Sequence, residues 1–300
     1  MKALKGLIRL ARPINAFICG VSVFCGSILG GEPFDRIRDF ISFFYFQMNA
    51  NFQSWELRTL SGAVSASLIL AAGNAFNDVR DLQSDRINTP HRPIPSGLIS
   101  PFGATIFAVI LALSGLILSF PLGIPGFTVA IGAIALLAVY SIKLKSVPLA
   151  GNVAVAFLGG LAFIYGGIAG YSIERAVLPA AFALFFHLGR ELLKDAADVK
   201  GDFPSGIKTA ATEWEKEVAC IFAATIFMIL AIFTVSPFTF GFFGIGYFLV
   251  IVLGVWPVLI YASISSLRDS SEKNLRKISL LLKIDMPVGI IAILMGFQGY

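Results

Sequence analysis

The chain has 300 residues, of which 57% are hydrophobic and only 14% are charged, and its mean hydropathy is +0.83. These values exclude an ordinary soluble globular domain and indicate a protein embedded in a lipid bilayer. The formal net charge is +5. Because the basic residues are scattered over many short segments, this charge does not indicate nucleic-acid binding.

Apolar stretches long enough to cross a bilayer recur along the whole chain. We predict an all-α membrane protein with about nine transmembrane helices around a central cavity, forming one integral-membrane domain over residues 1–300. The basic segment before the first span is interpreted as part of an uncleaved first helix. The predicted spans begin near residues 14, 58, 101, 125, 151, 174, 213, 243 and 278.

Two of these helix starts have capping signals. Ser100 followed by Pro101 is typical of an N-cap with a first-turn proline, and Thr212 with Glu215 predicts a capping box. The segment from Glu32 to Glu56 is amphipathic and aromatic, but it is too short and too charged to span a membrane. We therefore expect this segment to lie along the membrane interface.

Lysine and arginine are concentrated on alternate connections of the predicted helices. Of the 23 basic residues, only Arg36, Arg38, Arg58 and Arg175 fall on the other side. Because cytoplasmic loops hold the excess of basic residues, the N-terminus and the acidic-motif loops are predicted to be cytoplasmic. An odd number of helices then puts the C-terminus outside, in a multi-pass protein of the cell membrane.

Aspartates are concentrated at the ends of the second and sixth predicted helices. The first acidic motif, residues 74–97, contains Asn74, Asn77, Asp78, Asp81 and Asp85. The second acidic motif, residues 190–209, contains Asp195, Asp198 and Asp202. Spacings of three and four residues predict that each set lies on one helix face. The same spacing recurs at one constant offset, and Pro-Ser-Gly follows each copy, which suggests two duplicated helical halves facing one cavity.

Carboxylates at the membrane need cations, because an acid at membrane depth costs about 2.5–3.5 kcal/mol. Magnesium prefers oxygen ligands and completes its coordination with water and substrate phosphates. We therefore predict that two or more Mg²⁺ ions hold one diphosphate between the motifs and neutralise its charge as it leaves. For one motif alone, a solvated helix end is the alternative. The predicted metal ligands are Asp78, Asp81, Asp85, Asp195, Asp198 and Asp202.

Over nearly its full length, the chain resembles the UbiA superfamily of intramembrane prenyltransferases. That family has N-x-x-x-D-x-x-x-D and D-x-x-x-D signatures on the second and sixth of nine helices. The matching residues here are Asn77, Asp81 and Asp85 in the first motif and Asp198 and Asp202 in the second. The resemblance implies that metals bind an isoprenyl diphosphate, that an allylic cation forms, and that the acceptor attacks its first carbon. It implies catalytic roles for these four aspartates.

The resemblance also implies a catalytic aromatic residue, for which we select Tyr140. It ends the fourth predicted helix, where the family often has a tyrosine followed by basic residues, and its ring is expected to shield the cation. An interfacial tyrosine is the alternative. The residues expected to bind substrate are Asn15, Asn77, Asp78, Arg86, Arg92, Lys143, Lys145 and Lys194. Each basic residue among them is equally interpretable as a topology determinant. We interpret His187 as a buried, hydrogen-bonded histidine, and a position lining the cavity is the alternative.

Within the family, the chain most resembles the archaeal ether-lipid branch, in LIRLARPINAFICGVSVFCGSILGG, GNAFNDVRDLQSDRINTPHRPIPSG and KDAADVKGDFPSGIKT. This resemblance implies geranylgeranyl diphosphate as the isoprenyl donor. It implies geranylgeranylglyceryl phosphate, a lipid-like acceptor that bears a phosphate, as the second substrate. Candidates to contact that phosphate are Lys200, Lys208, Lys143 and Lys145.

Other functions compete with this interpretation. The nearest is the same fold acting on an aromatic acceptor, such as 4-hydroxybenzoate or a quinone precursor. An ion-coupled transporter would also have internal repeats and membrane-embedded acids, but it predicts acids deep within broken helices rather than at helix ends. A soluble isoprenyl diphosphate synthase is excluded by the continuous apolar spans. Cys19, Cys25 and Cys220 have no metal-binding spacing and are interpreted as apolar core residues.

Overall fold

The computed structural model describes residues 2–30, 35–37 and 54–296, and these residues contain helices, turns and loops but no β-strand. The first helices are α1 (Lys2–Ala11), α2 (Pro13–Ile28), α4 (Trp55–Arg80), α5 (Leu82–Asn88), α6 (Pro101–Leu118), α7 (Gly123–Ile142) and α8 (Ala150–Ala169). They are followed by α9 (Ile173–Asp202), α10 (Ala210–Glu213), α11 (Lys216–Phe233), α12 (Ser236–Thr239), α13 (Ile245–Val250), α14 (Trp256–Arg268) and α15 (Glu272–Gly296). Short 3₁₀ and π turns are η1 (Phe120–Leu122), η2 (Leu144–Ser146) and η3 (Ile251–Val255).

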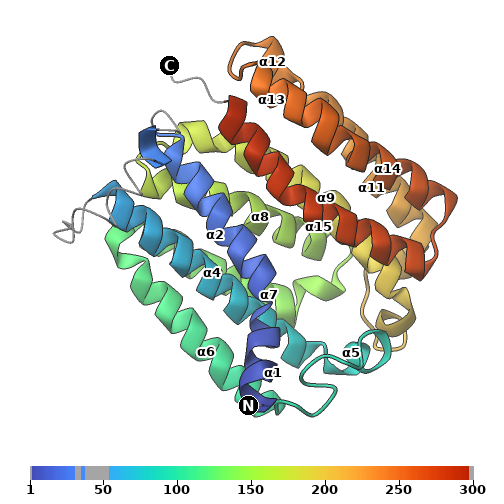
Figure 1. Cartoon of the computed structure of the whole chain (residues 1–300). Helices are drawn as coiled ribbons and strands as arrows, with labels where there is room; N and C mark the ends of the chain where they lie inside the picture. The colour runs from blue at the N-terminus through green and yellow to red at the C-terminus, as the bar shows by residue number, and fades with distance from the viewer. Residues whose placement is uncertain (1, 31–34, 38–53, 297–300) are drawn as a thin grey trace.

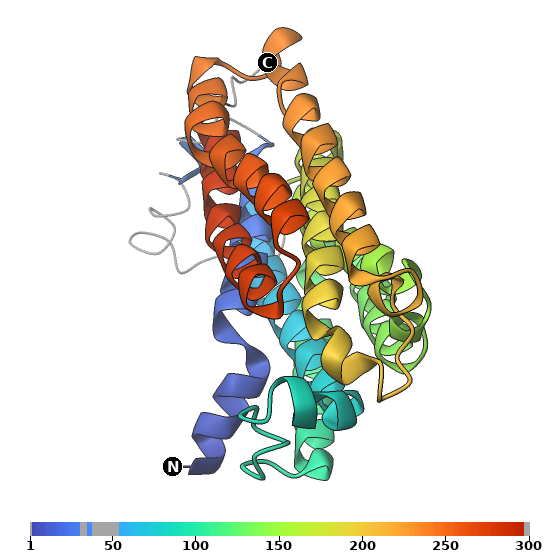
Figure 2. The ribbon, with the colours of Figure 1, turned by 90° about the vertical axis from the view of Figure 1, so that its right-hand side faces the viewer.

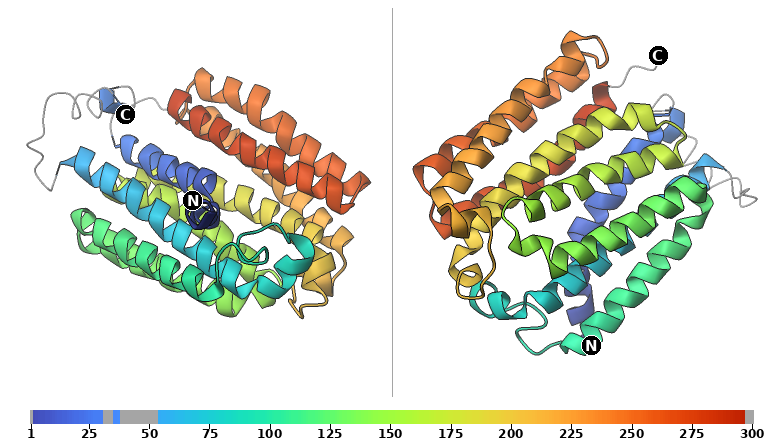
Figure 3. Two further views of the ribbon diagram at one scale, coloured as in Figure 1. Left: turned by 60° about the horizontal axis from the view of Figure 1, so that its bottom comes forward. Right: turned by 180° about the vertical axis from the view of Figure 1, so that it is seen from behind.

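Most of these helices are built to cross a membrane. Among the described residues, seven helices or helix runs are long and apolar enough to do so, and α1 with α2, bent by 41°, makes an eighth. One of these runs, Pro101–Ile142, contains both α6 and α7, which lie side by side in the rear view of Figure 3. The all-α, multi-pass membrane architecture is therefore confirmed. The starts predicted near residues 101, 151 and 174 agree with the first residues of α6, α8 and α9.

The long helices lie side by side and give the molecule two distinct ends (Figure 1). The start of α1 and the short helix α5 lie at one end, and α15 finishes at the other. The view turned by 90° shows the same separation (Figure 2). Since α4 and α9 both finish at the end that holds α5, the folded chain brings both acidic motifs to one end of the helical bundle.

Glycines allow α2 and α8 to pack closely. A Cβ on Gly26 would lie 2.3 Å from the carbonyl oxygen of Phe163, and a Cβ on Gly166 would lie 2.1 Å from that of Val23. Within a bilayer, helices associate through close packing rather than through the hydrophobic effect, so small residues are favoured at such contacts. This contact fixes α2 against α8, and both helices contribute side chains to the cavity described below.

Arg58 stabilises the end of the bundle opposite the acidic motifs. It is buried at the start of α4, and its guanidinium donates hydrogen bonds to the carbonyl oxygens of Pro121 (2.7 Å), Ile168 (2.8 Å) and Ala169 (3.2 Å). The last two carbonyls belong to the C-terminal end of α8, where a positive charge complements the helix dipole. Arg58 is one of the four basic residues outside the predicted cytoplasmic loops. It donates hydrogen bonds to backbone carbonyl groups that would otherwise lack a partner at the end of α8.

The two capping predictions had different outcomes. Ser100 is the N-cap of α6, and its hydroxyl accepts a hydrogen bond from the Gly103 amide at 3.1 Å, as predicted. The capping box predicted for Thr212 and Glu215 is wrong. The box forms between Thr209 and Thr212 and begins the short helix α10, because the Thr212 hydroxyl accepts the Thr209 amide at 2.8 Å. Glu215 instead precedes α11 in a left-handed conformation, with a φ of 76°.

Two smaller predictions concern the first interhelical segment and the cysteines. Of the segment from Glu32 to Glu56, only residues 35–37 and 54–56 are described, so the interfacial prediction lies outside the described residues. Cys19, Cys25 and Cys220 are free thiols, and the last two are buried among apolar residues, as expected.

Candidate active site

The first acidic motif lies at the junction of α4 and α5. Asp81 links the two helices, between Arg80 and Leu82. The Asp81 amide donates to the Asn77 carbonyl at 2.9 Å and the Asp85 amide donates to the Asp81 carbonyl at 2.8 Å, so the helical register continues through the junction. The predicted arrangement of these side chains at helical spacing is therefore retained.

Arg92 and Arg12 neutralise two of the first motif's aspartates. The Arg92 guanidinium lies 2.6 Å from Asp85 and 3.3 Å from Asp78. Asp78 also pairs with Arg12, the residue at the bend between α1 and α2. Burial raises the pKa of Asp85, while the charge and hydrogen bond of Arg92 and the Thr89 hydroxyl oppose that rise. The predicted substrate-binding residue Arg92 is thus placed directly on the motif.

Asp81 is held by the side chains of Asn77 and Lys145. Its Oδ2 accepts a hydrogen bond from Asn77 Nδ2 at 2.6 Å and lies 2.6 Å from the Lys145 ammonium. Lys145 comes from η2, the short turn after α7, so a connection distant in sequence completes this contact. The side-chain amide oxygen of Asn77, Oδ1, is buried without a hydrogen-bond partner among the described residues. It is a free oxygen donor beside a carboxylate.

The second acidic motif occupies the last turns of α9. Asp195 accepts a hydrogen bond from Asn152 of α8 at 2.7 Å, and Asp198 lies 3.0 Å from Arg276 of α15. Asp202, the final residue of α9, is buried. The aspartates of this motif therefore connect α9 to helices on both sides of it.

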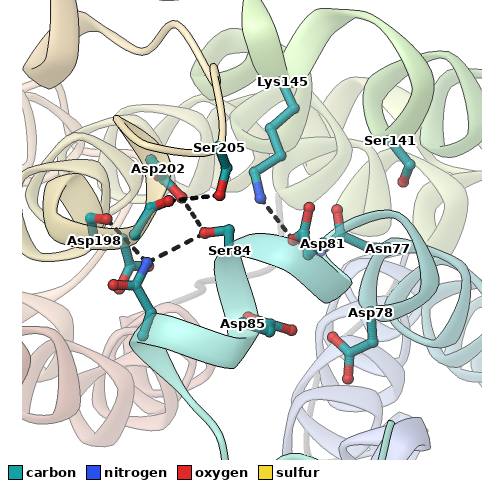
Figure 4. A network of polar contacts seen from close by, with 12 residues as sticks. Asn77, Asp78, Asp81, Ser84, Asp85, Ser141, Lys145, Asp198, Asp202 and Ser205 are labelled. Carbon is teal, nitrogen blue, oxygen red and sulfur yellow. Dashed lines mark hydrogen bonds and ion pairs between the residues drawn. The ribbon is translucent and has the colours of Figure 1, made fainter. Parts of the chain in front are cut away.

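The two motifs contact each other directly (Figure 4). Ser84 donates a hydrogen bond to Asp202 at 2.5 Å, and Asn88 donates to the carbonyl oxygen of Asp198 at 2.9 Å. Close approach depends on Gly201, because a Cβ there would lie 2.5 Å from the Asn88 side chain. Asp81 and Asp202 therefore face a common region at the end of the bundle, where α4 and α9 finish and α5 begins.

A cavity of about 210 Å³ opens beside the motifs, between α2, α4, α7, α8, α9 and α15. Four predicted site residues line it, namely Asn15, Asn77, Tyr140 and Lys194. Its remaining walls include apolar residues such as Leu137 and Val155. A polar head and apolar walls in one cavity suit a ligand that carries a charged group on a hydrocarbon chain.

Other basic residues singled out from the sequence lie away from this cavity. Arg86 is on the exposed face of α5, and Lys143 is exposed at the end of α7; within the described part of the chain, neither pairs with an acidic motif. Lys200 and Lys208 are also exposed.

Lys194 forms an ion pair with Glu191 at 2.9 Å. Among the basic residues expected to bind substrate, Arg92, Lys145 and Lys194 are thus the ones the fold gathers at the site.

Three basic residues that line the cavity were not predicted as site residues, namely Arg12, Arg190 and Lys283. Lys283 had a usable signal, because a lysine inside an apolar helix usually faces a polar interior. His187 also lines the cavity, where Gly159 leaves room for its ring, since a Cβ there would lie 2.2 Å from the imidazole. It forms no hydrogen bond with a described residue, so the hydrogen-bonded position expected for it is wrong.

The donor chemistry of the motifs suits a hard cation. The aspartates and the free Asn77 Oδ1 offer oxygen atoms only, which magnesium prefers. Across residues 2–30, 35–37 and 54–296, however, no three acidic, histidine or cysteine side chains converge tightly enough to form a ready ion site. Lys145, Arg92 and Arg276 instead pair with Asp81, Asp85 and Asp198. These basic side chains supply the positive charge that a bound cation would otherwise supply to the carboxylates.

Two smaller apolar cavities adjoin the central one. A cavity of about 90 Å³ shares Ile18 and Met286 with it, and a cavity of about 70 Å³ shares Cys19 and Leu137. Both have mainly apolar walls. A hydrocarbon chain leaving the central cavity therefore has two apolar directions available.

The chain is similar to known proteins over most of its length. The model of the UbiA prenyltransferase family matches residues 40–283, which is most of the chain. The chain belongs to this family. As a UbiA-family member it is a membrane prenyltransferase, and the ion-coupled transporter is set aside.

Related proteins are similar to this chain over nearly its full length. The digeranylgeranylglyceryl phosphate synthase of Methanopyrus kandleri is 31% identical over 97% of this chain and 98% of its own length. A solved structure of a digeranylgeranylglyceryl phosphate synthase is 28% identical, covers 99% of both chains and has a TM-score of 0.71. A UbiA homologue from Archaeoglobus fulgidus, solved with GPP and Mg²⁺, has a TM-score of 0.60 at 19% identity, covering 96% of this chain and 99% of its own. The UbiA fold of this chain is therefore established.

Proposed function

We propose that this UbiA-family enzyme transfers a geranylgeranyl group from geranylgeranyl diphosphate to the hydroxyl of geranylgeranylglyceryl phosphate, in archaeal ether-lipid biosynthesis. The direct contact between the two acidic motifs, through Ser84 and Asp202, is the observation that carries the proposal, and the cavity is lined by Asn77 of the first motif and Lys194 of the second. The relatives named digeranylgeranylglyceryl phosphate synthase support the choice of substrates.

Six aspartates and Asn77 are proposed to hold two or more Mg²⁺ ions together with the donor diphosphate. Bound there, Mg²⁺ would neutralise the charge that develops on the leaving diphosphate. Support comes from the oxygen-only donor set and from the Archaeoglobus fulgidus homologue, which was solved with Mg²⁺ and a prenyl diphosphate. The six aspartates are Asp78, Asp81, Asp85, Asp195, Asp198 and Asp202.

Basic and aromatic side chains assist the same step. Lys145 pairs with Asp81, and Arg92 pairs with Asp85. We propose that both basic side chains contact diphosphate oxygens when Mg²⁺ is bound to these carboxylates. Tyr140 lines the cavity and is proposed to place its ring beside the allylic carbon, where the π face stabilises positive charge. Asn15 and Lys194 line the same cavity and are proposed to contact substrate.

For the membrane topology we propose nine spans, with α1–α2 and α13–α14 each counted as one and α6 and α7 as two. The N-terminus and both motifs would face the cytoplasm and the C-terminus the outside, in agreement with the distribution of lysine and arginine. The recurrence of the aspartate spacing in Asp78–Asp85 and Asp195–Asp202 supports two duplicated halves.

The test is an acceptor competition with purified protein in detergent. Labelled geranylgeranyl diphosphate and Mg²⁺ are supplied, with geranylgeranylglyceryl phosphate and 4-hydroxybenzoate side by side. We expect label to enter the glyceryl phosphate alone, and product formation to stop with a chelator and in Asp81→Ala and Asp198→Ala. Prenylated 4-hydroxybenzoate would refute the acceptor, and full activity in either variant would refute the metal assignment.

A further inference from the structure

Lys283 lies in an unusual position for a basic residue. It belongs to α15, which is one of the candidate membrane spans, and it lines the central cavity. A charged residue at such depth is costly unless it faces the protein interior and meets a counter-charge. Among the described residues, however, no carboxylate pairs with Lys283. Its ammonium group is therefore available to a ligand.

The neighbouring charges increase this availability. Arg12 and Arg190 line the same cavity and repel Lys283 electrostatically. Their own acidic partners are already engaged: Arg12 pairs with Asp78, and Arg190 lies 3.0 Å from Glu191, which Lys194 also contacts. The cavity wall thus has four basic side chains against one acidic side chain, Glu191. Like charges held together in this way favour binding of an anion.

Lys283 lies apart from the diphosphate end of the site, which Arg12 reaches through its ion pair with Asp78. On α15, Arg276 contacts Asp198 of the second motif, and Lys283 lies two helical turns further along the same helix. At 1.5 Å per residue, that separation is about 10 Å. A diphosphate held between the aspartates would leave Lys283 and Arg190 for another anionic group.

The walls next to Lys283 indicate what the anionic group is attached to. Met286, on the same helix, lines both the central cavity and the adjoining cavity of about 90 Å³. Gly289, Ile290 and Ile293 continue along α15 as part of that mainly apolar wall, whose lining also includes the buried Asp285. An anion at Lys283 would therefore have a hydrocarbon chain beside it.

We propose that Lys283, Arg190 and Arg12 form a binding site for the phosphate monoester of an amphiphilic second substrate, with its apolar chain in the adjoining cavity. This inference rests on the proposed function, because it assigns the phosphate of the acceptor to that cluster. As the acceptor-phosphate site it replaces Lys143, Lys200 and Lys208, which are exposed, and Lys145, which pairs with Asp81.

The kinetic test compares Lys283→Met with the wild type and with Lys273→Met, a control on an exposed position of the same helix. Loss of a charge-assisted phosphate contact should raise the KM for geranylgeranylglyceryl phosphate about ten-fold or more. The KM for geranylgeranyl diphosphate should stay within about two-fold, and Lys283→Arg should restore most of the acceptor affinity. With geranylgeranylglycerol, which lacks the phosphate, Lys283→Met and wild type should react equally. An unchanged acceptor KM, or an equal rise in both KM values, would overturn the site.

A binding test without turnover separates this inference from the proposed function. Dodecyl phosphate is titrated into the detergent-solubilised proteins, and binding is followed by the shift in thermal unfolding temperature, with dodecanol as the neutral comparison. Wild type and Lys273→Met should bind the phosphate at least about ten-fold more tightly than Lys283→Met does, and dodecanol should not distinguish them. Selective binding without geranylgeranylglyceryl phosphate turnover would refute the function and keep the site. Equal binding by all three proteins would refute the site.

Discussion

The Ser84 hydroxyl donates a hydrogen bond to Asp202 at 2.5 Å, and this contact joins two acidic motifs that lie more than a hundred residues apart in the chain. Both residues are buried. A buried carboxylate that lost this donor would be left with an unsatisfied oxygen and would hold its position less firmly. The contact therefore predicts that Ser84 sets the alignment of the motifs.

Ser84→Ala should lower kcat/KM for the donor about ten-fold or more, because a hydrogen bond to a charged carboxylate typically contributes about 1.5 to 3 kcal/mol. Steady-state kinetics at saturating acceptor measure this. Ser146→Ala, at an exposed serine of η2, is the matched control and should change nothing. If Ser84→Ala matches the control, the motifs do not depend on this contact.

Lys145 is expected to compete with metal for Asp81, since its ammonium lies 2.6 Å from the carboxylate. Lys145→Met should strengthen Mg²⁺ binding in the absence of substrate, by up to about ten-fold, because one positive charge at the site is removed. Calorimetric titration of Mg²⁺ measures this. Lys143→Met, at an exposed neighbour, should bind Mg²⁺ like the wild type. Weaker binding by Lys145→Met would contradict the competition.

Tyr140 is predicted to act through its ring. Tyr140→Phe should retain activity within about three-fold, whereas Tyr140→Leu should lose about thirty-fold in kcat, since a cation–π contact in a desolvated site is worth about 2 kcal/mol. Single-turnover rates with bound donor isolate this step. Equal losses in the two variants would show that the hydroxyl, not the ring, matters.

Gly166 is predicted to control the stability of the fold, because a Cβ there would lie 2.1 Å from the Val23 carbonyl oxygen. Gly166→Ala should separate α2 from α8 and cost about 1–3 kcal/mol, measured as a lower midpoint of thermal unfolding in detergent. Gly132→Ala is the control, since nothing lies within 4 Å of its Cβ position. It should be neutral or slightly stabilising. An unchanged midpoint for Gly166→Ala would mean that the helices repack freely.

The parts predictable from sequence were those set by local pattern. The length of the apolar stretches predicted the all-α, multi-pass architecture. The spacing of Asn77, Asp81 and Asp85 predicted their helical register, which the backbone hydrogen bonds through the α4–α5 junction preserve. The start of α6 at Ser100 followed from its cap and its proline.

The errors arose where two local patterns compete or where tertiary packing decides. Thr209 and Thr212 stand at the same spacing as Thr212 and Glu215, and only the fold selects the first pair. Arg86 lies within the first motif and Lys143 comes shortly after Tyr140 in sequence, but the fold leaves both side chains exposed. Lys283 was not predicted as a site residue, although its place inside an apolar helix indicated an interior position.

The central claim is that both acidic motifs hold one diphosphate through divalent ions. The most direct measurement is Mn²⁺ binding by electron paramagnetic resonance, with and without geranylgeranyl diphosphate, in wild type, Asp81→Asn and Asp202→Asn. We predict that the diphosphate increases Mn²⁺ binding in the wild type and that either substitution, one in each motif, abolishes the increase. Wild-type behaviour in either variant would mean that its motif does not take part, and the account of the site would be contradicted.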